Sequence, residues 1–177
     1  MLYDMALADA YGIAFEFCDQ PNPNDLGGYY QHHSYEDMVP GHYTDDTQRS
    51  IANAFVILNK GPEEWLNPLT WIESYQQVFK NDPRPGYSRR YEAFLKENID
   101  VTPMDFALKI VRKPTNGSVM GAAVLGYIKN PELLMMVAAA QAISTHSYNP
   151  IRANRGTCGP LLYTQKRSEI PDEGFHH

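Results

Sequence analysis

The stretch that decides the fold runs from Thr44 to Lys60, TDDTQRSIANAFVILNK. Thr44 is a residue type favoured at helix N-caps, and Asp45 and Asp46 suit a first turn because the helix dipole favours negative charge there. Apolar residues then recur with helical spacing, at Ile51, Ala52, Phe55, Val56 and Leu58. The pattern predicts an amphipathic helix that begins with two adjacent acids.

Helical spacing also dominates the rest of the chain. It recurs from Trp65 to Phe79, and further helices are expected over residues 5–10, 89–97, 104–111, 118–128 and 132–145. Because no segment shows the alternating pattern of a strand, we predict an all-α protein. We expect one helical domain over residues 1–150 and an irregular tail over residues 151–177.

Composition limits the classes of partner. The chain has 177 residues, enough for one domain, and a net charge of -6 without a long basic cluster, which argues against nucleic-acid and anionic-membrane binding. The longest apolar run, Leu133–Ala140, is too short to span a bilayer, and the first residues lack the basic start of a signal peptide. Cys18 and Cys158 form no zinc-ribbon or disulfide pattern. We expect a cytoplasmic protein, and the oligomeric state is not encoded in these patterns.

The acid pair is the strongest candidate for chemistry. Magnesium prefers hard oxygen ligands, and the two carboxylates with the Thr44 hydroxyl offer several on one turn. Adjacent carboxylates also repel each other, which a divalent cation relieves. Taken alone, however, the pattern fits acids that only stabilise a helix start, or an Asp45–Arg49 pair one turn apart.

A second acidic motif lies near the N-terminus. Asp9 and Glu16 bracket the apolar segment Ala10–Phe15, which contains Gly12. One interpretation is a helix that ends at Gly12 and is followed by an exposed acid. The other is that Glu16 projects from a loop into a site formed by other helices.

Two further motifs follow the central helices. Asn116-Gly117-Ser118-Val119-Met120 is a turn that opens a helix, where backbone N–H groups can bind phosphate, although Asn-Gly is also a common turn dipeptide. His146 ends an Ala-rich helix and is either a cation at the helix end or a ligand. A zinc site from His32, His33 and His42 is disfavoured, because adjacent histidines rarely bind the same ion.

The order of these motifs resembles the ADP-ribosylglycohydrolase family, which includes dinitrogenase-reductase-activating glycohydrolases and ADP-ribosylarginine hydrolases. The resemblance rests on Asp-Ala-x-Gly…Glu, Tyr-Thr-Asp-Asp-Thr, Asn-Gly-x-x-Met and Thr-His, and covers roughly residues 1–150. The loop Asp82–Tyr87 also resembles a family segment. Several motifs in the right order are more specific than any one of them.

The resemblance implies a compact all-α fold around two Mg²⁺ ions and an enzyme that hydrolyses the ribose C1″ linkage of ADP-ribosylated protein side chains or a related ADP-ribose conjugate. It implies metal ligands at Thr44, Asp45 and Asp46, and catalytic carboxylates at Asp46 and Glu16. It implies substrate contacts at Asn116, Gly117, Ser118, Met120, His146 and Tyr87.

Some positions depart from the family pattern. Ala8 stands where Gly usually precedes Asp-Ala, and Gly121 stands where Arg usually follows Met. The family's second metal motif, Asp-x-Asp, has no match after His146. We therefore expect the second ion to bind weakly and the activity of this short form to be reduced or lost.

The alternatives are a non-catalytic ADP-ribose or nucleotide-binding module and a chain that needs a partner to complete its site. Linkage specificity depends on pocket loops and is not encoded in these motifs. Asp82 either meets a substrate guanidinium or caps a turn, and the second interpretation is favoured.

Overall fold

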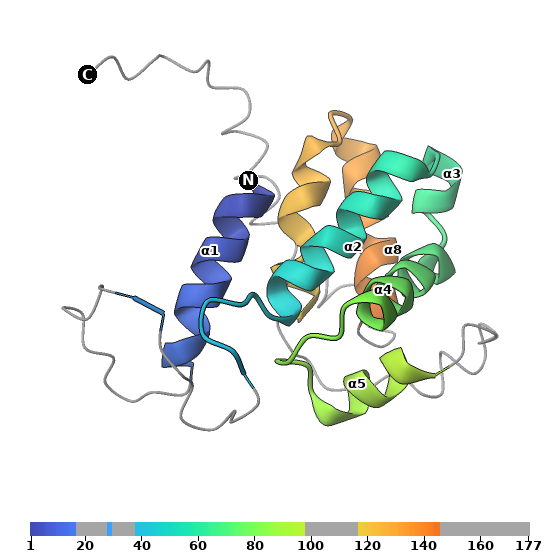
Figure 1. The fold of residues 1–177 in the computed structure, drawn as a ribbon. Coiled ribbons are helices and arrows are strands. Elements are labelled where there is room, and N and C mark those ends of the chain that lie inside the picture. Colours follow the sequence, from blue (N-terminus) through green and yellow to red (C-terminus); the bar gives the residue numbers. More distant parts are fainter. Residues whose placement is uncertain (17–27, 30–37, 98–116, 146–177) are drawn as a thin grey trace, which may run out of the picture.

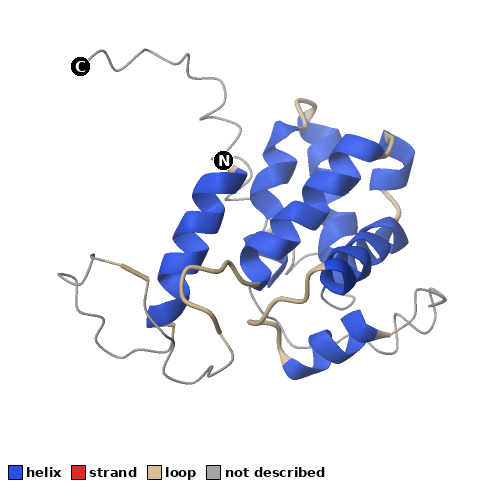
Figure 2. Ribbon diagram, in the orientation of Figure 1, coloured by secondary structure: helices blue, strands red, loops and turns tan. Residues whose placement is uncertain are grey.

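The computed structural model describes residues 1–16, 28–29, 38–97 and 117–145. Its α-helices are α1 (Leu2–Gly12), α2 (Asp45–Asn59), α3 (Pro62–Trp65), α4 (Pro68–Asn81), α5 (Arg89–Lys96), α7 (Gly117–Met120) and α8 (Pro131–Thr145). Two 3₁₀ helices are η1 (Ile13–Phe15) and η2 (Ala122–Tyr127). The described residues contain no strand, which confirms the all-α prediction (Figure 2).

The core lies between α2, α4, η2 and α8, which pack against one another (Figure 1). α4 buries one apolar face, as the spacing of its apolar residues predicts. On α2, Ala52 and Val56 of the predicted apolar face are buried, whereas Phe55 and Leu58 are exposed, so the expectation was wrong for those two residues. The largest fully buried apolar side chains come from α4, α5, η2 and α8, and they are Trp71, Leu95, Leu125, Leu134 and Val137. This core holds α2 rigidly, so the acids at its start have a fixed position.

A buried polar network ties the same helices together. The Tyr75 hydroxyl donates to Asn53 Oδ1 at 2.7 Å and accepts from Gln141 Nε2 at 2.9 Å. Asn53 Nδ2 donates to the carbonyl of Gly121 at 2.8 Å. A Cβ atom at residue 121 would lie 2.6 Å from Asn53 Nδ2, so this close approach requires glycine. The packing of η2 on α2 thus explains the glycine at a position where the family usually has arginine.

Two predicted helices are interrupted. The helix expected from Trp65 to Phe79 is instead α3 followed by α4, because Pro68 cannot continue a helix and begins a new one. The Asn67 side chain caps that start by accepting from the Leu69 N–H at 3.1 Å. The helix expected over residues 118–128 bends at Gly121 into the 3₁₀ helix η2. The helix expected over residues 104–111 lies outside the described residues.

Two further segments, α1 and the loop between α4 and α5, lie at the N-terminal end of α2. α1 lies along one side of α2, and α5 packs against α4 (Figure 1). The start of α2 is therefore bordered by α1 and by the loop that connects α4 to α5. Of the described helices, none is long and apolar enough to cross a membrane.

Candidate functional site

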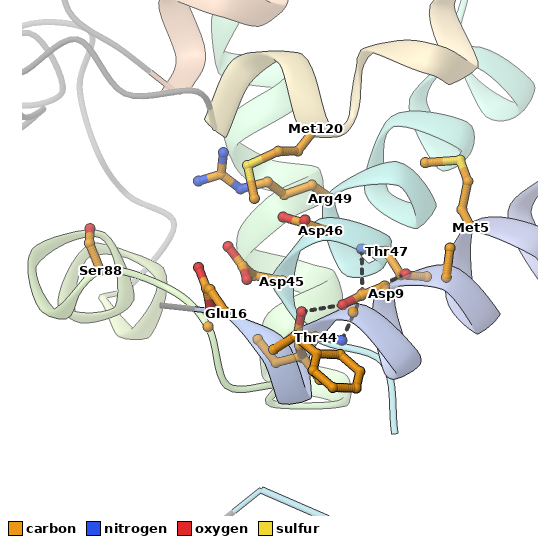
Figure 3. A pocket seen from close by; sticks show the side chains of 15 residues that line it. Met5, Asp9, Glu16, Thr44, Asp45, Asp46, Thr47, Arg49, Ser88 and Met120 are labelled. Atoms are coloured by element: carbon orange, nitrogen blue, oxygen red, sulfur yellow. Dashed lines mark hydrogen bonds between the residues drawn. The ribbon is translucent and has the colours of Figure 1, made fainter. Parts of the chain in front are cut away.

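The start of α2 is held by a carboxylate from another helix, Asp9 of α1 (Figure 3). Asp9 Oδ2 accepts hydrogen bonds from the backbone N–H of Thr44 at 2.8 Å, the N–H of Thr47 at 3.1 Å and the Thr47 hydroxyl at 2.7 Å. Asp9 Oδ1 accepts from the Thr44 hydroxyl at 2.6 Å. Thr44 occupies the N-cap position as predicted, but its side chain accepts no capping bond. The sequence motif contained Asp9, yet sequence reasoning gave it no role.

Of the two acids that follow, Asp45 is buried and Asp46 is half-buried. Asp45 is 8 % exposed, and burial raises its pKa to about 7, assisted by the charges of Asp46 and Asp9 and opposed by Arg49. Burial also raises the pKa of Asp46 to about 6, with repulsion from Asp9 and Glu16 adding to it. Asp46 Oδ1 is buried without a hydrogen-bond partner in the part of the chain that the structure describes. The pair therefore sits in a position where negative charge is costly unless a cation joins it.

The loop between α4 and α5 closes over Asp45. The Asp45 N–H donates to the carbonyl of Pro85 at 3.1 Å, so the loop backbone satisfies one of the free donors of the first turn of α2. Gly86 has φ +105°, and a Cβ atom there would lie 2.0 Å from Asp45 Oδ1. Glycine is needed at this position for both its backbone angle and the closeness of the carboxylate.

The other end of this loop is fastened by Asp82 at the end of α4. Asp82 Oδ2 accepts from the Tyr43 hydroxyl at 2.5 Å and from Arg84 Nε at 2.8 Å, and the Arg84 guanidinium lies 4.2 Å from the centre of the Tyr43 ring. Gln48 of α2 donates to the Asp82 carbonyl. The hydrogen bond from Arg84 holds the pKa of Asp82 below its usual range. The guanidinium that Asp82 meets in this structure thus belongs to the chain itself.

A single turn below the acids, α2 carries a buried cation. Arg49 is 6 % exposed, and its guanidinium lies 4.7 Å from the centre of the Tyr91 ring and 5.5 Å from that of Tyr87. Tyr87 itself is partly buried and packs edge-on against Phe79 at 5.6 Å. The aromatic faces fix the guanidinium without cancelling its charge. Arg49 therefore opposes the rise of the Asp45 and Asp46 pKa values.

These elements surround a pocket of about 710 Å³. It is lined from α1, η1, the start of α2, the α4–α5 loop and the end of α7. The predicted site residues among its lining are Glu16, Thr44, Asp45, Asp46 and Met120. Sequence reasoning did not assign several others to the site, among them Asp9, Arg49, Gly86 and Ser88. The pocket therefore joins segments that lie more than a hundred residues apart in the chain.

The other predicted substrate residues are placed as follows. Tyr87 lies between the pocket-lining residues Gly86 and Ser88, with its ring against Arg49. Gly117 and Ser118 begin α7, whose last residue is Met120. Asn116 and His146 lie outside the described residues. Their predicted contacts with a diphosphate and a nucleotide remain predictions.

The donors at the pocket suit a hard divalent cation in kind. They are carboxylate and hydroxyl oxygens, and the buried Asp46 Oδ1 is an oxygen that such an ion would satisfy. The described residues contain no group of three or more His, Cys, Asp or Glu side chains arranged to hold a metal ion. The described carboxylate and hydroxyl oxygens can therefore supply some of the ligands of a metal ion. His42, from the disfavoured zinc set, contacts Arg84 Nη1 at 3.1 Å, and His32 and His33 lie outside the described residues.

Comparison with known proteins gave one result. A model of a protein family described as ADP-ribosylglycohydrolase matches residues 1–155 of the chain. Neither the curated proteins nor the solved structures gave a match.

Proposed function

Since the chain belongs to the ADP-ribosylglycohydrolase family, we propose that it is a magnesium-dependent hydrolase of the ribose C1″ linkage in ADP-ribosylated protein side chains or a related ADP-ribose conjugate. One observation carries this proposal. The buried Asp45 and the half-buried Asp46 lie side by side at the wall of a pocket that Glu16 also lines. Acids that only stabilised a helix start would face bulk water.

The proposed reaction adds water across the bond between C1″ and the side-chain nitrogen or oxygen. The bond from C1″ to that atom breaks, and the leaving nitrogen or oxygen keeps the electron pair and takes up a proton. The water oxygen bonds to C1″ and loses a proton. Bound magnesium would supply positive charge that lowers the pKa of a water and orients oxygen atoms of the substrate.

The chain's own residues have the following roles in this proposal. Thr44, Asp45 and Asp46 hold the ion, and Asp46 accepts the proton of the attacking water. Glu16 is the exposed residue that follows η1 and lines the pocket. In this proposal it contacts the ribose.

The test is release of ADP-ribose by the purified full chain. Arginine- and serine-linked ADP-ribosylated proteins are incubated with increasing Mg²⁺, and free ADP-ribose is measured by liquid chromatography and mass spectrometry. Asp46→Asn and Glu16→Gln are expected to reduce the rate by about a hundredfold or more, as expected for loss of an acid–base group. Glu63→Gln, at an exposed carboxylate of α3, is the matched control and should leave the rate unchanged.

The competing function is a non-catalytic module that binds ADP-ribose or a nucleotide. It predicts calorimetric binding of ADP-ribose that is the same with and without EDTA, and no release from either conjugate. That pair of results would overturn the hydrolase proposal. Release that does not depend on magnesium would overturn only its metal-dependent part.

A further inference from the structure

The cap of α2 differs from the usual arrangement. An N-cap threonine normally uses its hydroxyl oxygen to accept from the N–H three residues on. Here that N–H belongs to Thr47, and it donates to Asp9 Oδ2 instead. The Thr44 hydroxyl acts as a donor, to Asp9 Oδ1 at 2.6 Å. Asp9, which belongs to α1, therefore caps α2, and the Thr44 hydroxyl oxygen is not used for capping.

Because Asp9 caps α2, the Thr44 hydroxyl oxygen is available for another interaction. A hydroxyl has one hydrogen and two lone pairs. With the hydrogen directed at Asp9, and the Thr47 N–H already satisfied, the lone pairs are not needed for capping. A short hydrogen bond to a carboxylate also increases the negative charge on the hydroxyl oxygen. Thr44 lines the pocket beside Asp45 and Asp46, and a hydroxyl oxygen is a hard ligand of the kind that magnesium prefers.

We infer that Asp9 is a positioning residue of the proposed cation site: it caps α2 in place of Thr44 and so leaves the Thr44 hydroxyl oxygen free to bind a divalent cation. The inference rests on the proposed function and deepens it by assigning a residue that acts through Thr44. Figure 3 shows the geometry, with the Asp9 carboxylate reaching from α1 to both threonines.

The two oxygens of Asp9 have unequal partners, and this makes a sharp variant possible. Among the described residues, Oδ2 accepts from two backbone N–H groups and one hydroxyl, whereas Oδ1 accepts from the Thr44 hydroxyl alone. In Asp9→Asn the amide oxygen must take the place of Oδ2, because the backbone N–H groups of Thr44 and Thr47 can only donate and need an acceptor there. The amide NH₂ then faces Thr44, whose hydroxyl has to turn and accept. That turn uses one of the two lone pairs and directs the hydroxyl hydrogen away from residue 9, so the oxygen becomes a poorer ligand for the cation.

Two further variants separate this effect from loss of the cap. Thr47→Val removes the 2.7 Å hydrogen bond from the Thr47 hydroxyl to the same carboxylate but leaves the Thr44 hydroxyl as it is. Thr44→Val removes the proposed ligand itself. The double variant Asp9→Asn with Thr44→Val tests whether Asp9 acts through Thr44.

The measurement is cation affinity of the folded full chain. Binding of Mg²⁺ is followed by calorimetry and binding of Mn²⁺ by electron paramagnetic resonance, with circular dichroism to establish the folded fraction of each variant. Asp9→Asn should weaken binding by about tenfold or more, as for other residues that orient metal ligands. Thr47→Val should bind like the wild type, and Asp9→Asn should add no further loss in the Thr44→Val background.

The outcomes are distinguishable from failure of the proposed function. Wild-type affinity in Asp9→Asn, or equal losses in Asp9→Asn and Thr47→Val, would overturn the inference, since Asp9 would then only cap the helix. Both results leave the metal-dependent reaction intact. A wild-type chain that binds neither Mg²⁺ nor Mn²⁺ would overturn the inference together with the metal dependence, even if hydrolysis were observed.

Discussion

Burial of Asp45 predicts that the protein without added magnesium becomes less stable as the pH rises from 5 to 8. The folded-state pKa of about 7 lies above the value of 3.8 for an unburied aspartate. Between these two values the folded state binds a proton that the unfolded state does not. The resulting stabilisation is fully present below pH 3.8 and is lost as the pH rises through about 7.

The size of the effect follows from the same two pKa values. Proton linkage with values of 3.8 and about 7 gives a loss of about 3 kcal/mol in the free energy of unfolding between pH 5 and pH 8. For a chain of this length that corresponds to a fall of roughly 6–12 °C in the midpoint of thermal unfolding. Asp82 does not add to this fall, because its lowered pKa gives a stabilisation that is already complete above pH 5.

The assay is urea unfolding followed by circular dichroism at pH 5, 6, 7 and 8 in EDTA. Asp45→Asn is the control because it keeps the size of the side chain and removes its titration. Its neighbour Asp46 titrates with Asp45 as a pair, so the difference between wild type and variant reports on both. If Mg²⁺ binds the ionised carboxylates as proposed, its addition should abolish the fall in the wild type only. A wild-type curve parallel to that of Asp45→Asn across this range would refute the reasoning.

Three other substitutions test the surroundings of the acids. Gly86→Ala should cost about 1–2 kcal/mol in unfolding free energy from its backbone angle alone, and more because its Cβ contacts Asp45, so a neutral result in urea unfolding would show that the loop is not pressed against the carboxylate. Arg49→Met removes the charge that opposes protonation of the acid pair, so the loss of stability should extend to higher pH than in the wild type; an unchanged profile would contradict that role. Asp82→Asn should lower the unfolding free energy by less than about 1 kcal/mol because its pair with Arg84 is partly exposed, and a larger loss would mean that the loop depends on this one contact.

Local patterns were sufficient to predict the central helix and its acids. The spacing of apolar residues in α2 and the sequence Thr44-Asp45-Asp46 act within a few residues, where helix periodicity and capping preferences apply. The break between α3 and α4 was also encoded locally, because Asn67-Pro68 is a helix start. The expectation of one continuous helix there was wrong because the apolar spacing was given more weight than the proline.

The other features of the site form only where segments that are far apart in the sequence come together. Asp9 contacts Thr44 across 35 positions of the chain, and nothing in the sequence near either residue specifies that contact. The same holds for the Arg49 guanidinium on Tyr91, which becomes a feature of the site only when α5 packs on the core. Gly86 lies within the loop Asp82–Tyr87, which the sequence showed only as a family-like segment. Glycine is needed there because the Asp45 carboxylate lies close by, and only folding brings the two residues together.

The energetics of Asp45 distinguish the two interpretations of the acid pair. An exposed acid in the first turn of a helix contributes about 0.3–1 kcal/mol through the helix dipole. The rise in the pKa of Asp45 from 3.8 to about 7 corresponds to about 4 kcal/mol against its charged form, which outweighs that contribution. Without a cation the ionised side chain therefore destabilises the fold at neutral pH, and a neutral cap residue would serve the helix better. Such a cost is expected where charge is held ready for a ligand, and the same holds for the neighbouring Asp46 Oδ1, which has no hydrogen-bond partner among the described residues.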